Sequence, residues 1–459
     1  MKRLFAILII LSLLLSLCSC PRSNRKIYLD GVLISEYSIV YSEDSLDYNK
    51  RAAEYLRDEI FSRTGYQLAL VTDATEPASH EIVVGQTRRA ISETLSVETE
   101  GLEFAILADG GSVAMEADAF AIAGAAYYFI DTYLAQGNSS ATLPTEVLVR
   151  EPITKETTSV ILLIGDGMGV EQTRLFEYLE NSAEYSDGED LFYGYMLPYH
   201  GYSRTDSLSG TTDSAAGGTA LAAGYKTYNG YVGLKGDGTP ATSLVELFMS
   251  LNKATAVMST ESATGATPAS FSAHTDSRSN SSDIIDDQFE LELDGTHFSC
   301  GFDYYDQRYM KMIENNVITA LEKMEANPNG FFLMYEEAHI DKHSHSNDME
   351  NTFLALIRFN QVIARFMEYA LYHPGTLVLI TADHETGDLR SDGGTDAPVY
   401  HSEDHSSADV PVFAFGAGAE LFGGVTVENV QIPKTLASII GVSDFGDRES
   451  YPALVKNQE

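Results

Sequence analysis

The stretch Ser159–Ile164 constrains the fold of this chain more than any other feature. It reads Ser-Val-Ile-Leu-Leu-Ile, an apolar run too continuous for a strand with one face in water. Such a run is typical of a central parallel strand that is buried on both faces. Further strands are expected at 254–258, 330–335, 376–381 and 410–415, with helices at 242–252, 317–326 and 351–369. The alternation predicts an α/β fold, a mostly parallel sheet with helices on both faces.

Residues that can bind metals or move protons stand at the ends of these expected strands. Asp166 directly follows the first strand, and Glu336 ends a later one. Asp383 and His384 follow another strand, and His405 precedes the last. Functional residues of parallel sheets gather at the carboxyl ends of the strands. Asp166 alone is equally consistent with a helix cap or a turn, so the prediction depends on the whole set.

Asp341 and His345 are four residues apart, so a helix would place both side chains on one face. A carboxylate with an imidazole suits zinc, and an ion pair on the helix surface is the alternative. Thr267 and Arg278 complete the inventory. Together these residues exceed what one zinc ion needs. They suit two zinc ions and a hard, oxygen-liganded ion such as Mg²⁺.

Ser214 lies beside an acid and ahead of a run of small residues in Thr211–Ala220. At the start of a helix it would lie near backbone N–H groups and the positive end of the helix dipole. Both stabilise an anion and favour an alkoxide. The alternative is a serine that only caps an alanine-rich helix. The strand-end residues favour the nucleophile.

Several segments resemble the alkaline phosphatase family over about residues 158–444. They are Ile164–Gly169, Thr212–Ala220, Gly224–Gly230, Ala266–Ala269, Ala273–His274, Ser277–Arg278, Glu336–His345, Thr381–Gly387 and Glu403–His405. The resemblance implies an alkaline phosphatase-like catalytic domain over residues 159–459. It also implies hydrolysis of small phosphate monoesters to an alcohol and inorganic phosphate through a phosphoserine intermediate.

The same resemblance implies two Zn²⁺ and one Mg²⁺ as cofactors. By that resemblance the three ions are held by Asp341, His345 and His405; by Asp166, Asp383, His384 and Ser214; and by Asp166, Thr267 and Glu336 with waters. Ser214 is then the nucleophile and becomes transiently phosphorylated. Arg278 clamps two phosphate oxygens, for which a planar guanidinium is suited, and Lys342 reaches the phosphate through water.

The chain also departs from the pattern of the family that it resembles. Gly265 stands where many members carry His or Asp at the edge of the magnesium shell, which puts magnesium occupancy in question. Glu337 and His339 are bulkier than the residues often found beside the Glu336 equivalent. Only 20 residues separate His384 from His405, where larger members insert a subdomain. A more open active site is therefore expected.

The N-terminus resembles a bacterial export signal. Lys2 and Arg3 precede an apolar run that ends in Leu-Cys-Ser-Cys, so residues 1–19 are expected to be a lipoprotein signal peptide. Cys20 would then be the lipidated first residue, and ordinary cleavage near Ser19 is the alternative. We expect an exported protein in a bacterial cell envelope, bound to a membrane only through this anchor.

A second, smaller α/β domain is expected ahead of the catalytic one. Residues 20–26 are predicted to be a tether and residues 136–158 a polar linker. Between them, residues 27–135 alternate strands and helices, with Asp118 placed to cap a helix at 119–134. The order resembles the accessory domain that precedes the barrel in hexosaminidase-like glycoside hydrolases. A structural or spacing role is expected first, with carbohydrate binding as the alternative.

The formal net charge of -38 argues against nucleic-acid binding, because the phosphate backbone is itself anionic. Two other functions compete with a monoesterase. A phosphodiesterase or phosphonate hydrolase of the same superfamily would often use Thr as nucleophile and lack the magnesium site. An inactive, sugar-binding surface protein would be expected to have lost a ligand or the serine. The sequence does not name the physiological ester or the oligomeric state, and a homodimer stays open.

Overall fold

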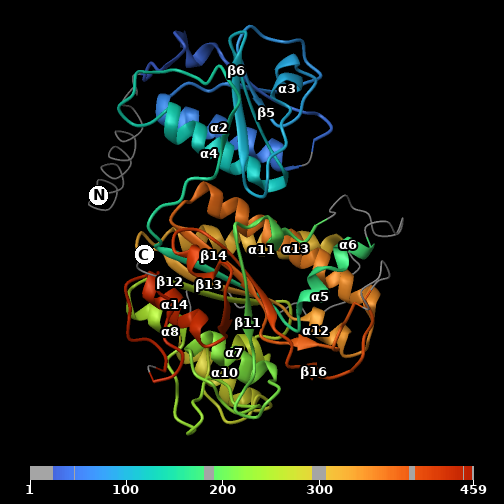
Figure 1. Ribbon diagram of the computed structural model, residues 1–459. Coiled ribbons are helices and arrows are strands. Elements are labelled where there is room, and N and C mark those ends of the chain that lie inside the picture. The colour runs from blue at the N-terminus through green and yellow to red at the C-terminus, as the bar shows by residue number, and fades with distance from the viewer. Residues whose placement is uncertain are drawn as a thin grey trace, which may run out of the picture. The chain divides into compact units, whose positions relative to one another are not determined.

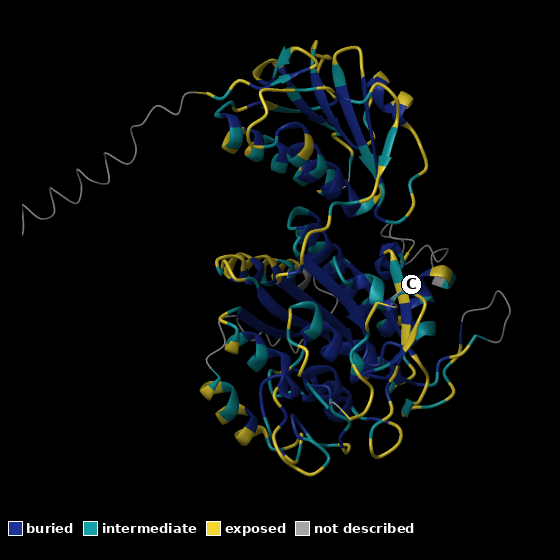
Figure 2. Cartoon of the chain, turned by 60° about the vertical axis from the view of Figure 1, so that its left-hand side comes forward, coloured by how far each residue is buried: buried dark blue, intermediate teal, exposed yellow. Residues whose placement is uncertain are grey.

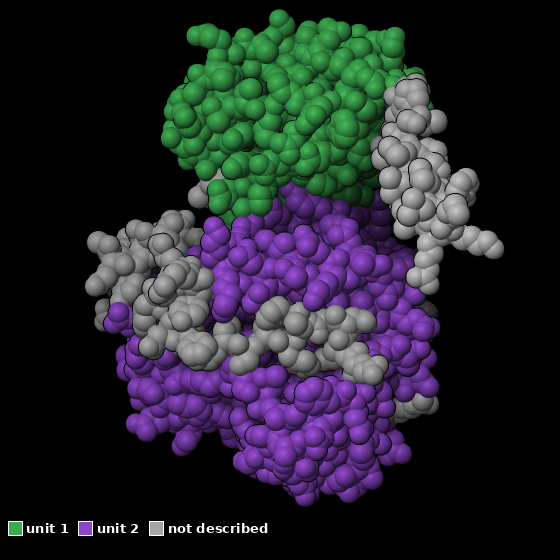
Figure 3. All heavy atoms as spheres, turned by 180° about the vertical axis from the view of Figure 1, so that it is seen from behind, with its two compact units in different colours: residues 1–99, 103–152 green, residues 100–102, 153–459 purple. Residues whose placement is uncertain are grey.

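The computed structural model describes residues 24–45, 47–179, 191–291, 307–391, 398–447 and 449–456. The chain forms two compact units, residues 1–99 with 103–152 and residues 100–102 with 153–459 (Figure 3). The expected signal peptide and Cys20 lie outside the described residues. Among the described helices, none has the length and apolarity that crossing a bilayer requires. The domain limits expected from the sequence, and the accessory role of the first domain, stay predictions.

The first unit is built on a six-stranded sheet in the order β4-β3-β5-β7-β6-β9. Strands β4, β3, β5 and β7 run parallel, while β6 pairs antiparallel with β7 and β9. The bounds are β3 Ser38–Tyr41, β4 Ala69–Thr72, β5 Glu81–Val84, β6 Phe104–Asp109, β7 Ser112–Ala117 and β9 Leu148–Arg150. A small sheet joins β1 Tyr28–Leu29, β2 Val32–Leu33 and β8 Ser140–Ala141, and η1 spans Ile34–Glu36.

Helices cover both faces of the six-stranded sheet (Figure 1). Helices α2 (Asp47–Thr64) and α4 (Ile122–Tyr133) pack against each other, and α3 (Ala90–Leu95) packs with apolar side chains of the strands. Asp118 precedes α4 as expected, but its side chain makes no capping hydrogen bond. The chain enters α4 through the 3-10 turn η2 (Ala119–Ala121) instead, so the predicted cap is wrong.

The second unit is built on a seven-stranded sheet in the order β12-β13-β10-β14-β17-β11-β18. Its strands are β10 Ser159–Gly165, β11 Tyr199–Arg204, β12 Ala254–Ser259, β13 Phe331–Glu337, β14 Thr376–Thr381, β17 Val410–Phe415 and β18 Thr426–Glu428. The four strands β12, β13, β10 and β14 are mutually parallel. All seven residues of β10 are buried, as its apolar run predicts (Figure 2).

Helices cover both faces of this sheet as well. The described helices and turns are α5 Val170–Thr173, α6 Leu175–Leu179, η3 Tyr193–Met196, α7 Ser214–Ala223, α8 Leu244–Ser250, α9 Ala266–Ser270, α10 Ser281–Glu290, α11 Gln307–Glu325, α12 His339–Ser344, α13 Met349–Tyr372, η4 Ala419–Phe422 and α14 Gln431–Ile439. In Figure 1, α11 and α13 lie on one side of the strands and α7, α8 and α14 on the other. Val160, Leu162 and Ile164 pack into the core beneath α7, α8 and α14.

Strand β17 differs from the parallel strand that the alternation suggests, because it pairs antiparallel with β14 and β11. Its first residue therefore lies at the edge where β10, β13 and β14 end. This reversal brings His405, which precedes β17, to the same edge as the other candidate residues. A two-residue ladder between β15 (Glu385–Thr386) and β16 (His405–Ser406) fixes it there.

A buried ion pair in the first unit offers a test of its packing. Arg89 and Glu81 are 6% and 4% exposed and form two hydrogen bonds of 2.8 and 3.1 Å. Arg89→Met should lower the free energy of unfolding by about 3–5 kcal/mol, because it leaves Glu81 charged and unpaired. Chemical unfolding of the full chain measures the loss.

The control is Arg57→Met, which removes an exposed pair with Asp58 and should cost under about 1 kcal/mol. Adding Glu81→Gln to Arg89→Met should recover part of the stability. Equal losses of unfolding free energy in Arg89→Met and Arg57→Met would contradict the prediction that the buried pair of Arg89 and Glu81 is worth more than an exposed one.

Candidate active site

Ser214 opens α7 but is not its cap. Asp213 is the N-cap residue, and its Oδ1 accepts a hydrogen bond of 3.0 Å from the N–H of Ala216. Ser214 is buried, and its Oγ lies 3.2 Å from Nε2 of His384. An added Cβ at Gly217 would lie 2.8 Å from the carbonyl oxygen of Asp383. The small residues after Ser214 therefore let α7 approach the loop that follows β14.

One group of candidate ligands consists of Asp166, Asp383 and His384. Their ligand atoms all lie within 4.8 Å of one another, and all three residues are buried. His384 Nε2 is 3.3 Å from Asp383 Oδ2 and 3.5 Å from Asp166 Oδ1. The neighbouring Gly167 has φ +72°, and an added Cβ there would meet Cα of Asp341 at 2.8 Å. The glycine after Asp166 thus allows both the turn and the close approach of α12.

A second group surrounds Asp341. Its Oδ1 lies 3.3 Å from His345 Nε2 and 3.4 Å from His405 Nε2, and these two nitrogens are 3.1 Å apart. His384 also belongs to this neighbourhood, because its ring stacks on that of His405 with centroids 3.6 Å apart. Asp341 lies on α12 and His345 is its C-cap residue. Their spacing has the effect that the sequence predicts, since the two side chains meet.

Glu336, near the end of β13, and Thr267, on α9, form a third polar group. Both side chains are fully buried. Ser259, the last residue of β12, donates a hydrogen bond from its Oγ to Oε2 of Glu336. Oε1 of Glu336 and Oγ1 of Thr267 have no hydrogen-bond partner among the described residues. Their unpaired oxygens are free to bind a hard cation.

Mutual repulsion dominates the electrostatics of the buried carboxylates. Burial, together with the charges of Asp383, Asp341 and Glu336, raises the pKa of Asp166 well above its ordinary value. Burial and the charge of Asp341 raise the pKa of Asp383 to about 7. Burial and the charge of Glu261 raise the pKa of Glu336 to about 8. Without positive charge nearby, these groups cannot all ionise at neutral pH.

His384, which lies among these carboxylates, is neutral. Burial, assisted by the charge of His405, lowers the pKa of His384 to about 3. Burial alone would raise the pKa of Asp341, but the hydrogen bond with His405 and the nearby His384 hold it below its ordinary value. A neutral imidazole beside ionised carboxylate is the state in which these side chains bind a metal.

Unsatisfied atoms show that the cluster fits cations. Asp166 Oδ1 and Asp383 Oδ2 are buried with no hydrogen-bond partner in the described part of the chain. The other oxygen of Asp383 accepts from the N–H groups of Gly167 and His384, which leaves Oδ2 facing the cluster. Unpaired buried oxygens are costly. Bound cations would satisfy them and remove the repulsion.

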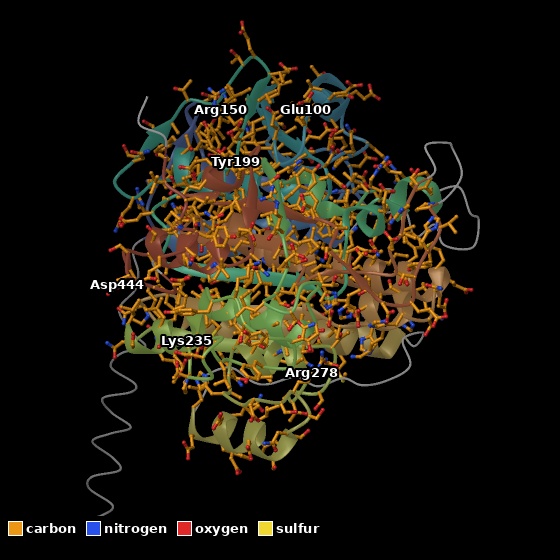
Figure 4. All side chains as sticks on the ribbon, turned by 60° about the horizontal axis from the view of Figure 1, so that its bottom comes forward. Glu100, Arg150, Tyr199, Lys235, Arg278 and Asp444 are labelled. Carbon is orange, nitrogen blue, oxygen red and sulfur yellow. The ribbon has the colours of Figure 1, made fainter. Side chains whose placement is uncertain are left out.

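An open cavity of about 460 Å³ lies over Ser214. Its lining residues are Thr211, Thr212, Asp213, Ser214, Asn229, Arg278, Asp341, His345, Asp404 and His405. Arg278, labelled in Figure 4, is 41% exposed and pairs with Asp213 at 3.3 Å. The nucleophile candidate and the arginine candidate therefore share one cavity. Lys342 is not among the residues that line it and pairs with Glu261 instead.

Sequence reasoning missed several residues that support the site. Thr386 donates a hydrogen bond of 2.5 Å to Asp341 Oδ1, and it does lie in the matching segment Thr381–Gly387. Glu337 points away from Glu336 and is held by Arg358 of α13 and by Thr260. No motif marks these contacts, so only the fold shows why a bulky acid stands at 337.

A family model described as alkaline phosphatase matches residues 157–312 and 305–398, more than half of the chain. The chain belongs to the alkaline phosphatase family. Alkaline phosphatase 3 of Bacillus subtilis is 31% identical over 285 residues, which cover 50% of this chain and 62% of that protein. An alkaline phosphatase of Schizosaccharomyces pombe is 29% identical over 308 residues, covering 50% and 56%. These matches therefore span less than two thirds of the relatives' length.

Solved structures extend the comparison. The alkaline phosphatase from the Antarctic bacterium TAB5 has 28% sequence identity and a TM-score of 0.53, covering 62% of this chain and 98% of that chain. A variant of the TAB5 enzyme has been solved with Mg bound in the M3 site.

The raised pKa values predict how the metal-free protein responds to pH. With a pKa of about 7 for Asp383 and about 8 for Glu336, the folded state keeps protons that the unfolded chain releases near pH 4. The free energy of unfolding should therefore fall as pH rises from about 4 to about 8. Unfolding of the chelator-treated protein at several pH values measures this slope.

Two comparisons isolate the cluster from the rest of the acidic surface. Glu336→Gln should flatten the slope, because its amide does not titrate. Added zinc should stabilise the unmutated protein most at the upper end of this pH range. A slope that is the same in Glu336→Gln would show that Glu336 does not contribute to it.

Proposed function

We propose that this protein hydrolyses phosphate monoesters to an alcohol and inorganic phosphate through a phosphoserine on Ser214. The observation that carries the proposal is the position of Ser214 Oγ, at a helix start and 3.2 Å from His384 Nε2. It opens into the cavity that Arg278, Asp341 and His405 also line. A relative in Streptomyces griseus, a streptomycin-6-phosphate phosphatase, is 29% identical over 136 residues and is named for such a substrate.

The proposed cofactors are two Zn²⁺ and one Mg²⁺. One zinc ion would be held by Asp341, His345 and His405, and the other by Asp166, Asp383 and His384 with Ser214. Magnesium would be held by Asp166, Thr267 and Glu336. Carboxylate and imidazole donors suit the zinc ions, and carboxylate with hydroxyl suits magnesium. When bound, the ions supply Lewis-acid charge that offsets the negative oxygens of the ester.

Ser214 performs the chemistry in two displacements. Its Oγ forms a bond to phosphorus while the bond to the alcohol oxygen breaks, and the alcohol leaves with the serine's proton. Water then attacks the phosphoserine, which releases inorganic phosphate and restores the hydroxyl. The N-terminus of α7 stabilises negative charge at Oγ in both steps.

Arg278 is proposed to bind two non-bridging oxygens of the phosphate. Its pairing with Asp213 holds the guanidinium at the cavity wall. Because Asp213 is also the N-cap of α7, the same residue orients both Ser214 and Arg278. Lys342, bound to Glu261, would reach phosphate only through water, as the family resemblance implies.

Export and lipid anchoring at Cys20 belong to the proposal and rest on the signal sequence alone. A homodimer and a spacing role for the first unit are likewise proposed. A phosphodiesterase of the same superfamily is the competing activity. The two activities differ in the charge on the phosphorus group, so they are separated by the role of Arg278.

Ser214→Ala should lower kcat on a phosphomonoester by about 10³-fold or more, on the scale of losing a catalytic nucleophile. Bound metal should be unchanged, because Asp166, Asp383 and His384 remain. Mass spectrometry of acid-quenched enzyme should detect phosphate on Ser214 only in the unmutated protein. Ser250→Ala, at the far end of α8, is the control. Full activity of Ser214→Ala would end the covalent route.

Arg278→Ala should weaken monoester hydrolysis by about 2–4 kcal/mol in transition-state terms, the scale of oxyanion-stabilising contacts. Arg278→Lys should also lose activity, since an ammonium cannot reproduce the bidentate contact. Losses on a diester should be smaller, because it has one charged oxygen fewer. Ratios of kcat/KM on both esters measure the difference.

Arg204→Ala is the matched control, because Arg204 is an exposed arginine that also pairs with an acid, Glu428. It does not line the cavity over Ser214. Equal losses on the two esters in Arg278→Ala, or no loss on either, would remove Arg278 from the phosphate site and with it the best argument for monoester preference.

A further inference from the structure

A neighbouring side chain occupies the space that a Cβ at Gly265 would take, and the backbone at Gly265 does not demand a glycine. Its φ is −56°, a value open to any residue. An added Cβ would lie 1.9 Å from Oε1 of Glu261 and 2.4 Å from its Cδ. The Glu261 carboxylate therefore fills the space that a side chain at 265 would need.

Two contacts hold Glu261 in that space. Its N–H donates a hydrogen bond of 3.0 Å to Oγ of Ser259, and this hydroxyl in turn donates to Glu336. Its carboxylate pairs with Nζ of Lys342, and the side chain is only 20% exposed. Glu261 is thus a well-held acid, tied through one serine to the end of β13.

Three oxygen atoms of the proposed magnesium ligands point to a cation. Glu336 Oε1, Thr267 Oγ1 and Asp166 Oδ1 are buried without a hydrogen-bond partner in the described ranges. The charge of Glu261 acts on two of these groups, since it contributes to the raised pKa of both Glu336 and Asp166. Thr267 follows Gly265 by two residues at the start of α9.

We propose that Glu261 supplies a further carboxylate to the shell of the magnesium ion, in the place left by Gly265, and that Lys342 tunes its charge. The inference rests on the proposed assignment of Asp166, Thr267 and Glu336 to that ion. Magnesium keeps several waters when it binds proteins, so an additional acid beside its ligands binds it more tightly. The charged amino group of Lys342 would repel the ion, and the carboxylate of Glu261 neutralises that amino group.

Substitutions of Glu261 and Lys342 should therefore change the affinity for Mg²⁺ in opposite directions. Glu261→Gln removes the acid and leaves Lys342 unbalanced, so it should weaken Mg²⁺ binding by about 10- to 100-fold, as outer-shell losses do. Lys342→Met removes the opposing cation and should tighten Mg²⁺ binding. A residue with only a packing role would weaken binding in both variants, or in neither.

The experiment is a calorimetric titration of MgCl₂ into the full chain supplied with zinc. Glu420→Gln is the matched control, because Glu420 is also a partly exposed acid paired with a lysine, Lys456. This control should bind Mg²⁺ like the unmutated protein. Equal Mg²⁺ affinity in Glu261→Gln and Glu420→Gln would overturn the proposal, as would an unmutated protein that does not bind Mg²⁺.

A swap of positions gives a second arm. Glu261→Ala should weaken Mg²⁺ binding. Adding Gly265→Asp should restore the affinity to within a few-fold, because the new carboxylate at position 265 would occupy the space that Glu261 leaves. A double variant that binds no better than Glu261→Ala would contradict the proposal. Because binding is read without turnover, the result stands or falls separately from phosphomonoester hydrolysis.

Discussion

Repulsion among buried carboxylates is the constraint on which this site depends. Asp166, Asp383 and Glu336 are removed from water at the ends of three adjacent strands. Burial and mutual proximity hold their pKa values high, so positive charge must arrive before they can all ionise. The sheet provides the rigidity that holds like charges together. In the proposed enzyme, that stored repulsion becomes affinity for cations, which then attract an anionic ester to a strongly acidic protein.

Ser214 and Arg278 depend on the same arrangement in a less direct way. Asp213 caps α7 with one oxygen and holds Gly230 and Arg278 with the other. Gly217 lets this helix press against the loop of Asp383. Ser214, the N-terminus of α7 and the guanidinium of Arg278 are therefore placed by one aspartate and one close helix approach. The close approach of α7 to this loop accounts for the small residues that follow Ser214.

Much of this arrangement could be predicted because its signals are local. The apolar run of β10, the spacing of Asp341 and His345, and the acid after each strand are all visible in short stretches. Strand β11 gives no such signal, because its buried residues are Gly201 and Ser203. The reversal of β17 is also hidden, since an apolar strand reads alike in either direction. Glu261 carries no motif, and only the three-dimensional clash with position 265 reveals it. The predicted cap at Asp118 failed because a 3-10 turn provides the entry to α4.

The ladder between β15 and β16 has a consequence for the order in which the chain assembles. His384 and His405 are separated by 20 residues in sequence, and β15 pairs with β16 beside them. This local pairing closes a much smaller loop than the contacts of the central strands and costs less entropy. Asp166, Ser214 and Glu336 come from distant parts of the sequence and meet only when the central strands have docked. An unfinished chain therefore brings Asp383, His384 and His405 together but leaves both groups of candidate ligands incomplete. In the proposed enzyme, tight metal binding would then be confined to molecules whose central sheet is complete.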